Sequence, residues 1–180
     1  MLPIYVPDKE FFNEETMEFV TIKGATLHLE HSLVSISKWE AIWKVPFISS
    51  KEKTVEQLKS YIKCMTLTQN VDPRVYDILT NQNLTDITNY IDDPMTASWI
   101  NDDKKGPKSS EQVTSELIYW WMTALQIPWE AQKWHLNRLM MLIRIGNIKS
   151  QPPKKMKKGE ILSRNKSLNE ARRKKLNTKG

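Results

Sequence analysis

The stretch VTSELIYWWMTALQIPWEAQKWHLNRLMMLIRI, residues 113–145, predicts the core of this chain. Apolar residues recur in it at helical spacing on both sides of Pro128, which ends one helix before the next begins. We expect the first helix to start at Ser109 or Ser110 and the second to carry the apolar residues from Trp129 to Ile145. Because the link between them is short, the two helices should pack as antiparallel neighbours.

The residues before this core also show a helical pattern. Ser37–Glu40 has the spacing of a capping box and predicts a short helix that stops before Pro46. Thr54–Gln57 repeats the box, and the helix behind it should bury one apolar stripe. Two further helices are predicted, one opened by Pro73 and one stopped by Pro94. The stripes expected on these helices are Val55, Leu58, Ile62 and Met65, then Tyr76 and Leu79, then Leu84, Ile87 and Ile91.

The N-terminal segment has the composition of β-strands. Residues 16–22 are rich in β-branched and aromatic side chains, and residues 25–29 alternate apolar with polar. With Lys23–Gly24 as the turn between them, they predict a β-hairpin that has Leu27 and Leu29 on one face. Two strands alone are marginally stable, so they should pack on helices or add to a partner's sheet, and a free edge offers a route to self-association. The expected fold is therefore mainly α (α+β), with a small N-terminal β-hairpin and a compact helical domain.

Charge is divided unevenly along the 180 residues, whose formal net charge is +6. Residues 149–180 hold 12 basic and two acidic groups, which leaves 15 basic and 19 acidic groups in the first 148. All 16 aromatic residues also precede Lys149, and Pro152–Pro153 cannot continue a helix. We therefore expect a helical domain with its hairpin over residues 1–148 and a basic C-terminal arm over residues 149–180.

The basic arm buries too little apolar surface to fold alone, although its last third is rich in helix formers. Three interpretations stay open: a solvated arm, docking on an acidic protein surface, and contact with nucleic acid through phosphate neutralisation. No aromatic residue is interleaved for base stacking. The cations expected to carry any electrostatic contact are Lys154, Lys155, Lys157, Lys158, Arg172, Arg173, Lys174 and Lys175.

Composition excludes several classes of protein. No apolar run approaches the ~18 residues that a bilayer crossing needs, so no membrane association is expected. The N-terminus lacks the basic flank and apolar stretch of a secretory signal, and a lone cysteine indicates a reducing compartment. Five glycines argue against a Gly-rich phosphate-binding loop. These features favour a cytoplasmic protein.

No catalytic, cofactor-binding or metal-binding set is predicted, and the chain is expected not to be an enzyme. Three histidines lack an acidic or cysteine cluster of familiar metal-binding spacing. The cysteine has no general base nearby in the sequence, and adjacent aspartates point apart in turn-rich segments. Surface or interface histidines, a small buried thiol and solvated loops are the preferred interpretations. The residues concerned are His28, His31, His135, Cys64, Asp92–Asp93 and Asp102–Asp103.

Seven tryptophans are the feature that most needs an explanation. Trp120 and Trp121 are adjacent, so they cannot both point into one core, and one of them should lie at an element boundary or a protein contact. Core packing alone, a ligand cavity and a partner-binding groove are the three alternatives. Rigid aromatic and flexible thioether side chains suit a partner surface. The partner-binding hypothesis assigns that groove to Trp120, Trp121, Trp129, Trp134, Met140 and Met141.

Five stretches together resemble tail assembly chaperones of long-tailed bacteriophages. The likeness covers about Leu29 to Gly180 and follows overall pattern, without a catalytic signature. The stretches are Leu29–Glu40 (LEHSLVSISKWE), Tyr61–Thr68 (YIKCMTLT), Met95–Trp99 (MTASW), Trp129–Leu139 (WEAQKWHLNRL) and Arg164–Arg173 (RNKSLNEARR).

The resemblance implies a non-enzymatic assembly factor in the host cytoplasm, with no cofactor. Such proteins bind the long helical tape-measure protein, keep it soluble and help tail-tube subunits polymerise around it. Expected partners are therefore the tape-measure or other tail proteins, with a homo-oligomer as a further expectation. The rival hypothesis is a virion-structural or nucleic-acid-associated protein of head, neck or tail that uses the basic arm.

Overall fold

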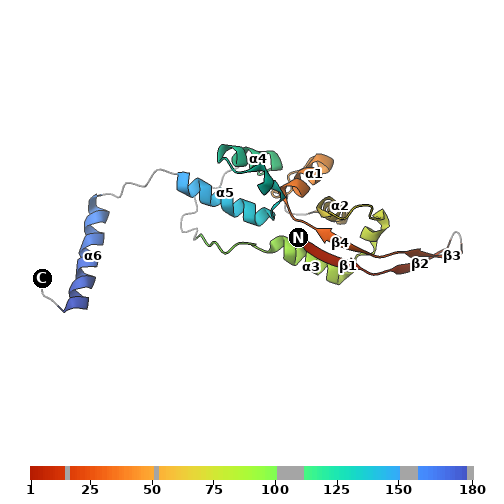
Figure 1. Cartoon of the computed structure of the whole chain (residues 1–180), viewed down its shortest axis with the longest axis horizontal. Coiled ribbons are helices and arrows are strands. Elements are labelled where there is room, and N and C mark those ends of the chain that lie inside the picture. Colours follow the sequence, from red (N-terminus) through yellow and green to blue (C-terminus); the bar gives the residue numbers. More distant parts are fainter. Residues whose placement is uncertain (15–16, 51–52, 101–111, 151–157, 178–180) are drawn as a thin grey trace. The chain divides into compact units, whose positions relative to one another are not determined.

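The computed structural model describes residues 1–14, 17–50, 53–100, 112–150 and 158–177. The described residues form antiparallel strand pairs at the N-terminus followed by helices, so the fold is mainly helical α+β, as predicted (Figure 1). Contacts within the chain divide it into two units, Met1–Asn147 and Ile148–Gly180. Each unit is described by itself.

The strands form one long ribbon that is interrupted midway. β1 (Leu2–Val6) pairs antiparallel with β4 (Ala25–Leu29), and β2 (Lys9–Asn13) pairs antiparallel with β3 (Glu18–Ile22). The predicted burial of Leu27 and Leu29 is confirmed. The predicted pairing of residues 16–22 with 25–29 is wrong, because each of these strands pairs with an earlier strand instead and the chain reverses between β2 and β3.

The sequence Lys23–Gly24 resembles a turn because a glycine is required where the ribbon is interrupted. A Cβ atom on Gly24 would lie 2.0 Å from the carbonyl oxygen of Val6, so only glycine permits this close approach of the two backbones. The Gly24 amide also donates to the Asp8 carboxylate at 2.7 Å. On the opposite strand, Pro7 has no N–H for the ladder. Gly24 therefore links two collinear strands and does not reverse the chain.

Substitution of Gly24 by alanine should lower the free energy of unfolding by about 2 kcal/mol, since the new methyl group forces the two backbones apart. Gly159→Ala is the matched control, because a Cβ there meets nothing within 4 Å in a helix. Urea unfolding followed by tryptophan fluorescence measures both variants. Equal stability of the two variants would contradict this account of Gly24.

The first long helix starts earlier than predicted. α1 (Leu33–Trp43) is capped by Ser32, whose side chain accepts from the Ser35 amide while the Ser35 side chain accepts from the Ser32 amide. Ser37 lies inside the helix, so the start predicted there is wrong: the Ser32–Ser35 pair satisfies the first amides one turn earlier. The predicted stop before Pro46 is confirmed.

The second helix starts as predicted and buries the second half of the predicted stripe, Ile62 and Met65. α2 (Val55–Met65) begins at Thr54, and Gln57 completes the capping box. The buried residues are Tyr61, Ile62 and Met65, which pack towards α1. The predicted stripe is wrong in its first turn, because its members Val55 and Leu58 are exposed there.

The next two elements contact different neighbours: the first packs on α2 and the second packs on β1. η1 (Pro73–Asp77) is a short 3₁₀ helix, so the helix predicted to run through Leu79 ends after about one turn. α3 (Asn81–Asp92) packs along β1, and it buries Ile87 and Tyr90 as its apolar face (Figure 1).

The two helices of the predicted core are shorter than expected. α4 (Ser115–Ala124) begins at the cap Thr114, so the start predicted at Ser109 or Ser110, which lie outside the described residues, is wrong: residues 112–114 are not helical. α4 packs on α1 through the fully buried Ile118 and Met122. After Pro128 the chain forms the 3₁₀ helix η2 (Trp129–Lys133), and α5 (Leu136–Ser150) follows it.

Residues from every element of the first unit except β2 form one core, in which Trp39 of α1 is completely buried. The Trp39 indole N–H donates to the carbonyl of Gln57 at 2.9 Å and so ties α1 to α2. Leu125, which follows α4, lies against Gly146 of α5. In the second unit, α6 (Lys158–Leu176) is a helix whose described side chains are all exposed.

Candidate functional site

The tryptophan pair in α4 divides between core and surface. Ile118 and Met122 form the buried face of this helix. Trp121 packs half-buried against the core, whereas Trp120 is exposed on another side of the helix. Neighbouring residues on an α-helix project in different directions, so a double tryptophan presents one indole to solvent.

The second exposed indole belongs to η2. The Trp129 ring lies 5.5 Å from the ring of Tyr119, measured between centroids, and the Tyr119 hydroxyl donates to the Gln132 side chain at 3.1 Å. Trp129 itself is more than half exposed. Its ring is therefore supported by α4 on one side while much of its surface faces solvent.

The third exposed indole borders a groove on α5. Trp134 follows η2, and the guanidinium carbon of Arg138 lies 4.6 Å from the centre of the Trp134 ring, which is a cation–π arrangement. The hollow beside this pair has a volume of about 290 Å³. We call it the α5 groove and define it by Thr96, Ser98, Trp134, Arg138, Met141, Leu142 and Ile145.

The chemistry of the α5 groove combines apolar area with positive charge. Leu142, Ile145 and the Met141 thioether provide apolar surface, and Thr96 and Ser98 add hydroxyl groups to the lining. α5 contains arginines at positions 138 and 144 and has no acidic residue. Such a surface suits an apolar partner that carries carboxylates.

The six predicted partner-binding residues do not all line this groove. Trp134 and Met141 do, whereas Met140 packs half-buried against the core. Sequence reasoning missed Arg138, whose contact with Trp134 forms although Trp134 is extended and precedes α5, and it missed Trp99. Trp99 is 88% exposed in the segment that follows α3.

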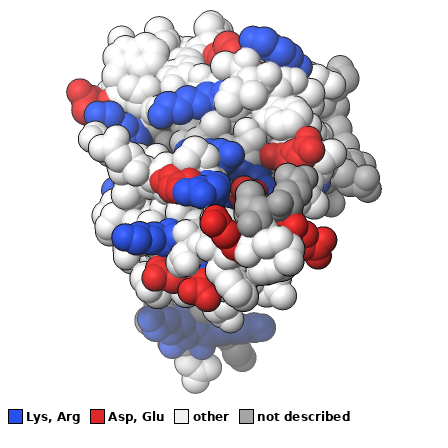
Figure 2. All heavy atoms as spheres, turned by 90° about the vertical axis from the view of Figure 1, so that its right-hand side faces the viewer, with Lys and Arg blue, Asp and Glu red and all other residues white. Residues whose placement is uncertain are grey.

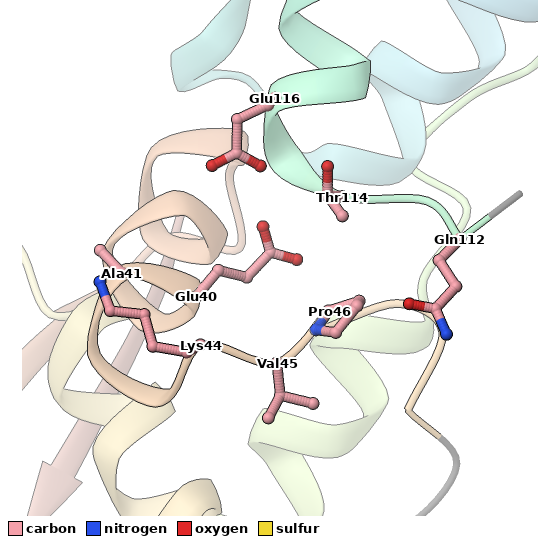
Figure 3. Close-up of a pocket in the computed structure, with 8 residues that line it drawn as sticks. All are labelled: Glu40, Ala41, Lys44, Val45, Pro46, Gln112, Thr114 and Glu116. Carbon is pink, nitrogen blue, oxygen red and sulfur yellow. The ribbon is translucent and has the colours of Figure 1, made fainter.

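A second hollow, of about 510 Å³, lies where α1 ends and α4 begins. Figure 3 shows the Glu40 and Glu116 carboxylates brought to it from the two helices. Glu40 is buried, and its two oxygens accept from the backbone amides of Phe47 at 2.7 Å and Ser115 at 2.8 Å. Hydrogen bonds from its own amide, Thr114 and Ser115 lower the pKa of Glu116. These carboxylates are thus structural acceptors at the start of α4.

The remaining lining of that hollow is Ala41, Lys44, Val45, Pro46, Gln112 and Thr114. Among them only Lys44 is ionisable, and it lies in the left-handed region (φ 55°) as the C-cap of α1. The buried carboxylate of Glu40 already has both oxygens occupied by amides. We therefore take the α5 groove and the exposed indoles as the candidate site.

Two of the three histidines lie together in the core, where sequence reasoning preferred a surface or an interface. The rings of His31 and His135 are 5.0 Å apart between centroids. His31 hydrogen-bonds through Nδ1 to the Tyr61 hydroxyl, and His135 Nε2 lies 2.9 Å from the Tyr90 carbonyl oxygen. Burial, and secondarily the neighbouring His135, lowers the pKa of His31 to about 3.

The rings of His31 and His135 thus hydrogen-bond to protein groups. His28 lies on β4, three residues before His31; its backbone amide donates to Thr68 at 2.9 Å, whereas its buried side-chain Nδ1 has no hydrogen-bond partner in the described part of the chain. Within the described ranges, no three His, Cys, Asp or Glu side chains are placed to hold a metal ion. The prediction of surface histidines is wrong for His31 and His135, which are 2% and 6% exposed.

The other candidate reactive groups have structural surroundings. Cys64 is half-buried, and burial raises the pKa of its thiol, so the protonated form dominates at neutral pH. Asp93 caps the end of α3, and its side chain accepts from the Met95 amide at 2.8 Å in a turn. The other predicted pair, Asp102–Asp103, lies outside the described residues.

The basic arm is described from Lys158 onward, so Lys154, Lys155 and Lys157 lie outside the described residues. Lys158 is the first residue of α6. Near the other end of this helix, Arg172, Arg173, Lys174 and Lys175 are exposed in one run. Four consecutive cations surround a helix on every side, so α6 has charge without a distinct apolar face.

None of the helices in the described segments is both long and apolar enough to cross a membrane. Comparison with known proteins finds no matching family model, no matching curated protein and no matching solved structure. The functional proposal therefore rests on the residues and geometry given above.

Proposed function

We propose that this chain is a non-enzymatic assembly chaperone that holds an apolar helix of another protein, as tail assembly chaperones of long-tailed phages hold the tape-measure protein in the host cytoplasm. The observation that carries the proposal is the exposure of three indoles within 15 residues: 62% for Trp120, 56% for Trp129 and 36% for Trp134. Exposed large apolar side chains at close spacing are typical of protein-binding surfaces.

The geometry around these indoles supports binding of a helix. A helical client presents side chains at spacings of three and four residues, and a groove beside a helix accepts such a row. The α5 groove supplies apolar walls, while the Arg138 guanidinium over Trp134 supplies a cation at its edge. An amphipathic client helix with a carboxylate near its apolar face would therefore be bound more tightly than a basic one.

The sequence resemblance supports the same proposal from another direction. The Trp129–Leu139 stretch, one of those that resemble the phage chaperones, contains Trp129, Trp134 and Arg138. Tail-tube assembly around the bound client would follow as the biological role. The opposing view, that the exposed indoles serve stability alone, requires no partner and predicts no binding.

A second candidate function is contact between the basic arm and DNA or an acidic capsid or tail surface. The observation that favours it is the exposed run of four cations in α6, Arg172–Lys175. A helix with no distinct apolar face gains little from an apolar client but interacts favourably with phosphates or carboxylates. We propose this only as the rival to helix binding.

The test is binding of the tape-measure protein encoded by the same genome, measured by co-purification and then by titration. The double variant Trp129→Ala and Trp134→Ala should weaken binding roughly 100-fold, because central aromatic residues contribute about 1–2 kcal/mol or more each. Val55→Ala and Leu58→Ala, which remove exposed apolar side chains on α2, are the matched control and should leave affinity within about twofold.

Salt and truncation separate the two candidate functions. Client binding through indoles should change little between about 50 and 200 mM salt and should survive deletion of residues 154–180, whereas DNA binding should weaken about tenfold or more and disappear with the arm. Unchanged client affinity in the double variant, or retention of nucleic acid alone, would contradict the chaperone proposal.

A further inference from the structure

The β2–β3 half of the ribbon has aromatic side chains that the body does not cover. Phe19 is 72% exposed, and Phe11 and Phe12 are also exposed. In Figure 1 this half continues beyond β1 and β4, which lie between α2 and α3. Only its base is covered, because Ile22 is buried in the core.

The register places these side chains on both faces of the ribbon. Phe12 is opposite Phe19, with their ring centroids 5.2 Å apart, and Phe11 is opposite Val20. Paired residues in an antiparallel ribbon point to the same face and successive residues to opposite faces. One face therefore carries the Phe12–Phe19 pair, and the other carries Phe11 with Val20.

The ribbon is also incomplete as a sheet. Among the described residues, β2 and β3 have each other as their only strand partner, so each keeps one edge of unpaired backbone groups. Two isolated strands are marginally stable in water, whereas three or more with an apolar face are stable. A partner that added strands would pair these edges and extend both apolar faces at once.

Charge distinguishes between the two edges. If β2 paired antiparallel with a second β2 about Phe11, Asp8 of each copy would lie opposite Glu14 of the other, which is unfavourable. β3 has Glu18 at its start and Lys23 just after its end, with no charge between them. In antiparallel self-pairing of β3 about Val20, Glu18 of each copy lies opposite the uncharged Ile22 of the other and next to Lys23, so no like charges oppose each other.

We propose that two copies of this chain pair antiparallel through the free edge of β3, so that their β2–β3 ribbons form one four-stranded sheet. About a two-fold axis at Val20, each Phe19 lies opposite Thr21 of the other copy, so the Phe12–Phe19 pairs of both copies share one face as diagonal neighbours. Figure 2, which views the molecule from this end, shows Lys or Arg and Asp or Glu side chains interspersed, so no large patch of one sign opposes the approach. This dimer does not depend on the helix-binding function.

Sedimentation velocity of the full chain, over about 1 to 100 µM, should show a concentration-dependent dimer. Phe19→Lys should weaken it roughly 100-fold, because a lysine at an edge blocks pairing of strands. Trp120→Lys is the matched control: it places the same charge at another exposed aromatic residue and should leave the dimer intact. Circular dichroism checks that both variants keep the native helix content. A monomer throughout the range, or loss of the dimer in Trp120→Lys, would overturn the proposal.

Spin labels identify the edge that pairs. Thr21 and Glu10 are exposed and lie opposite each other in the β2–β3 register. A single cysteine at either position, in a Cys64→Ala background, therefore places a label on β3 or on β2 at the same distance along the ribbon. In the proposed dimer the two Thr21 labels should be closer to each other than the two Glu10 labels by up to about 10 Å, which is two strand spacings. The reverse order, or dissociation of the dimer by high salt as a contact with the basic α6 would give, would overturn pairing through β3.

Discussion

Replacing Glu40 with alanine should lower the free energy of unfolding by about 4 kcal/mol, because it leaves two buried amides without acceptors. The Glu40 carboxylate accepts from Phe47 and from Ser115, and it therefore joins the end of α1, the loop after it and the first turn of α4. Urea unfolding followed by tryptophan fluorescence measures the loss. Hydrogen exchange should show that the amides of the first turn of α4 lose most protection.

Glu116→Ala is the matched control for Glu40, because both carboxylates border the same hollow (Figure 3). Glu116 is exposed in the first turn of α4 and accepts a side-chain hydrogen bond from Ser115. Its removal should cost below about 1 kcal/mol, the usual value of an exposed charge near a helix N-terminus. A loss as large as that of Glu40→Ala would refute the anchoring role of Glu40.

Local patterns in the sequence predicted the class of fold and most helices, but they predicted strand pairing poorly. Thr54–Gln57 is a complete capping box and marks the start of α2 correctly. The strands at residues 16–22 and 25–29 were recognisable, yet their partners lie earlier in the chain. Strand pairing depends on contacts between backbones, such as the approach of Gly24 to Val6. A glycine at this position is equally compatible with a turn, so the sequence alone does not distinguish a turn from a close backbone contact.

Competition between nearby caps explains the errors at helix starts. Ser37 and Glu40 have capping-box spacing, but Ser32 and Ser35 satisfy the first amides one turn earlier. The Glu40 side chain is therefore not needed for capping α1, and it accepts instead from the Ser115 amide, which is 75 residues away in the chain. No local rule assigns a glutamate such a distant partner.

The candidate site was only partly predictable: Trp134 and Met141 line the α5 groove as part of the predicted set, whereas Arg138 was not predicted. Adjacency alone indicates that one of Trp120 and Trp121 faces solvent, and the structure has Trp120 exposed. The predicted set, however, mixes residues that line the α5 groove with residues packed on the core, such as Met140. Helical spacing gives the direction of a side chain, whereas its exposure depends on which neighbouring elements cover it.

The buried histidine pair could not be predicted from the sequence for a different reason. His31 and His135 are more than 100 residues apart, and they meet because the chain after η2 bridges back to Ser32. There the Leu136 amide donates to the His31 carbonyl at 2.7 Å, and Ser32 and His135 form an isolated antiparallel β-bridge. Such a pair depends on tertiary structure, and it gives the fold a sensitivity to acid that composition does not reveal.

The free energy of unfolding should therefore fall as the pH is lowered from 7 to 4, by about 3 kcal/mol from His31 alone. The folded pKa of His31, about 3, lies below the unfolded value of 6.5, so between these values the unfolded chain binds a proton that the folded chain refuses. The contribution is fully present above about pH 6.5 and declines by about 1.4 kcal/mol per unit below it. Urea titrations at several pH values measure this slope.

The variant His31→Gln isolates the effect, because glutamine still offers hydrogen-bonding groups near Tyr61 but does not titrate. It should be less stable than the natural chain at pH 7, since its shape does not match the ring packed beside His135, and its stability should depend less steeply on pH. His28→Gln, at the histidine outside the buried pair, should keep the steep slope. If all three proteins lost stability in parallel between pH 7 and 4, carboxylates elsewhere would account for the acid sensitivity and the role given to His31 would be wrong.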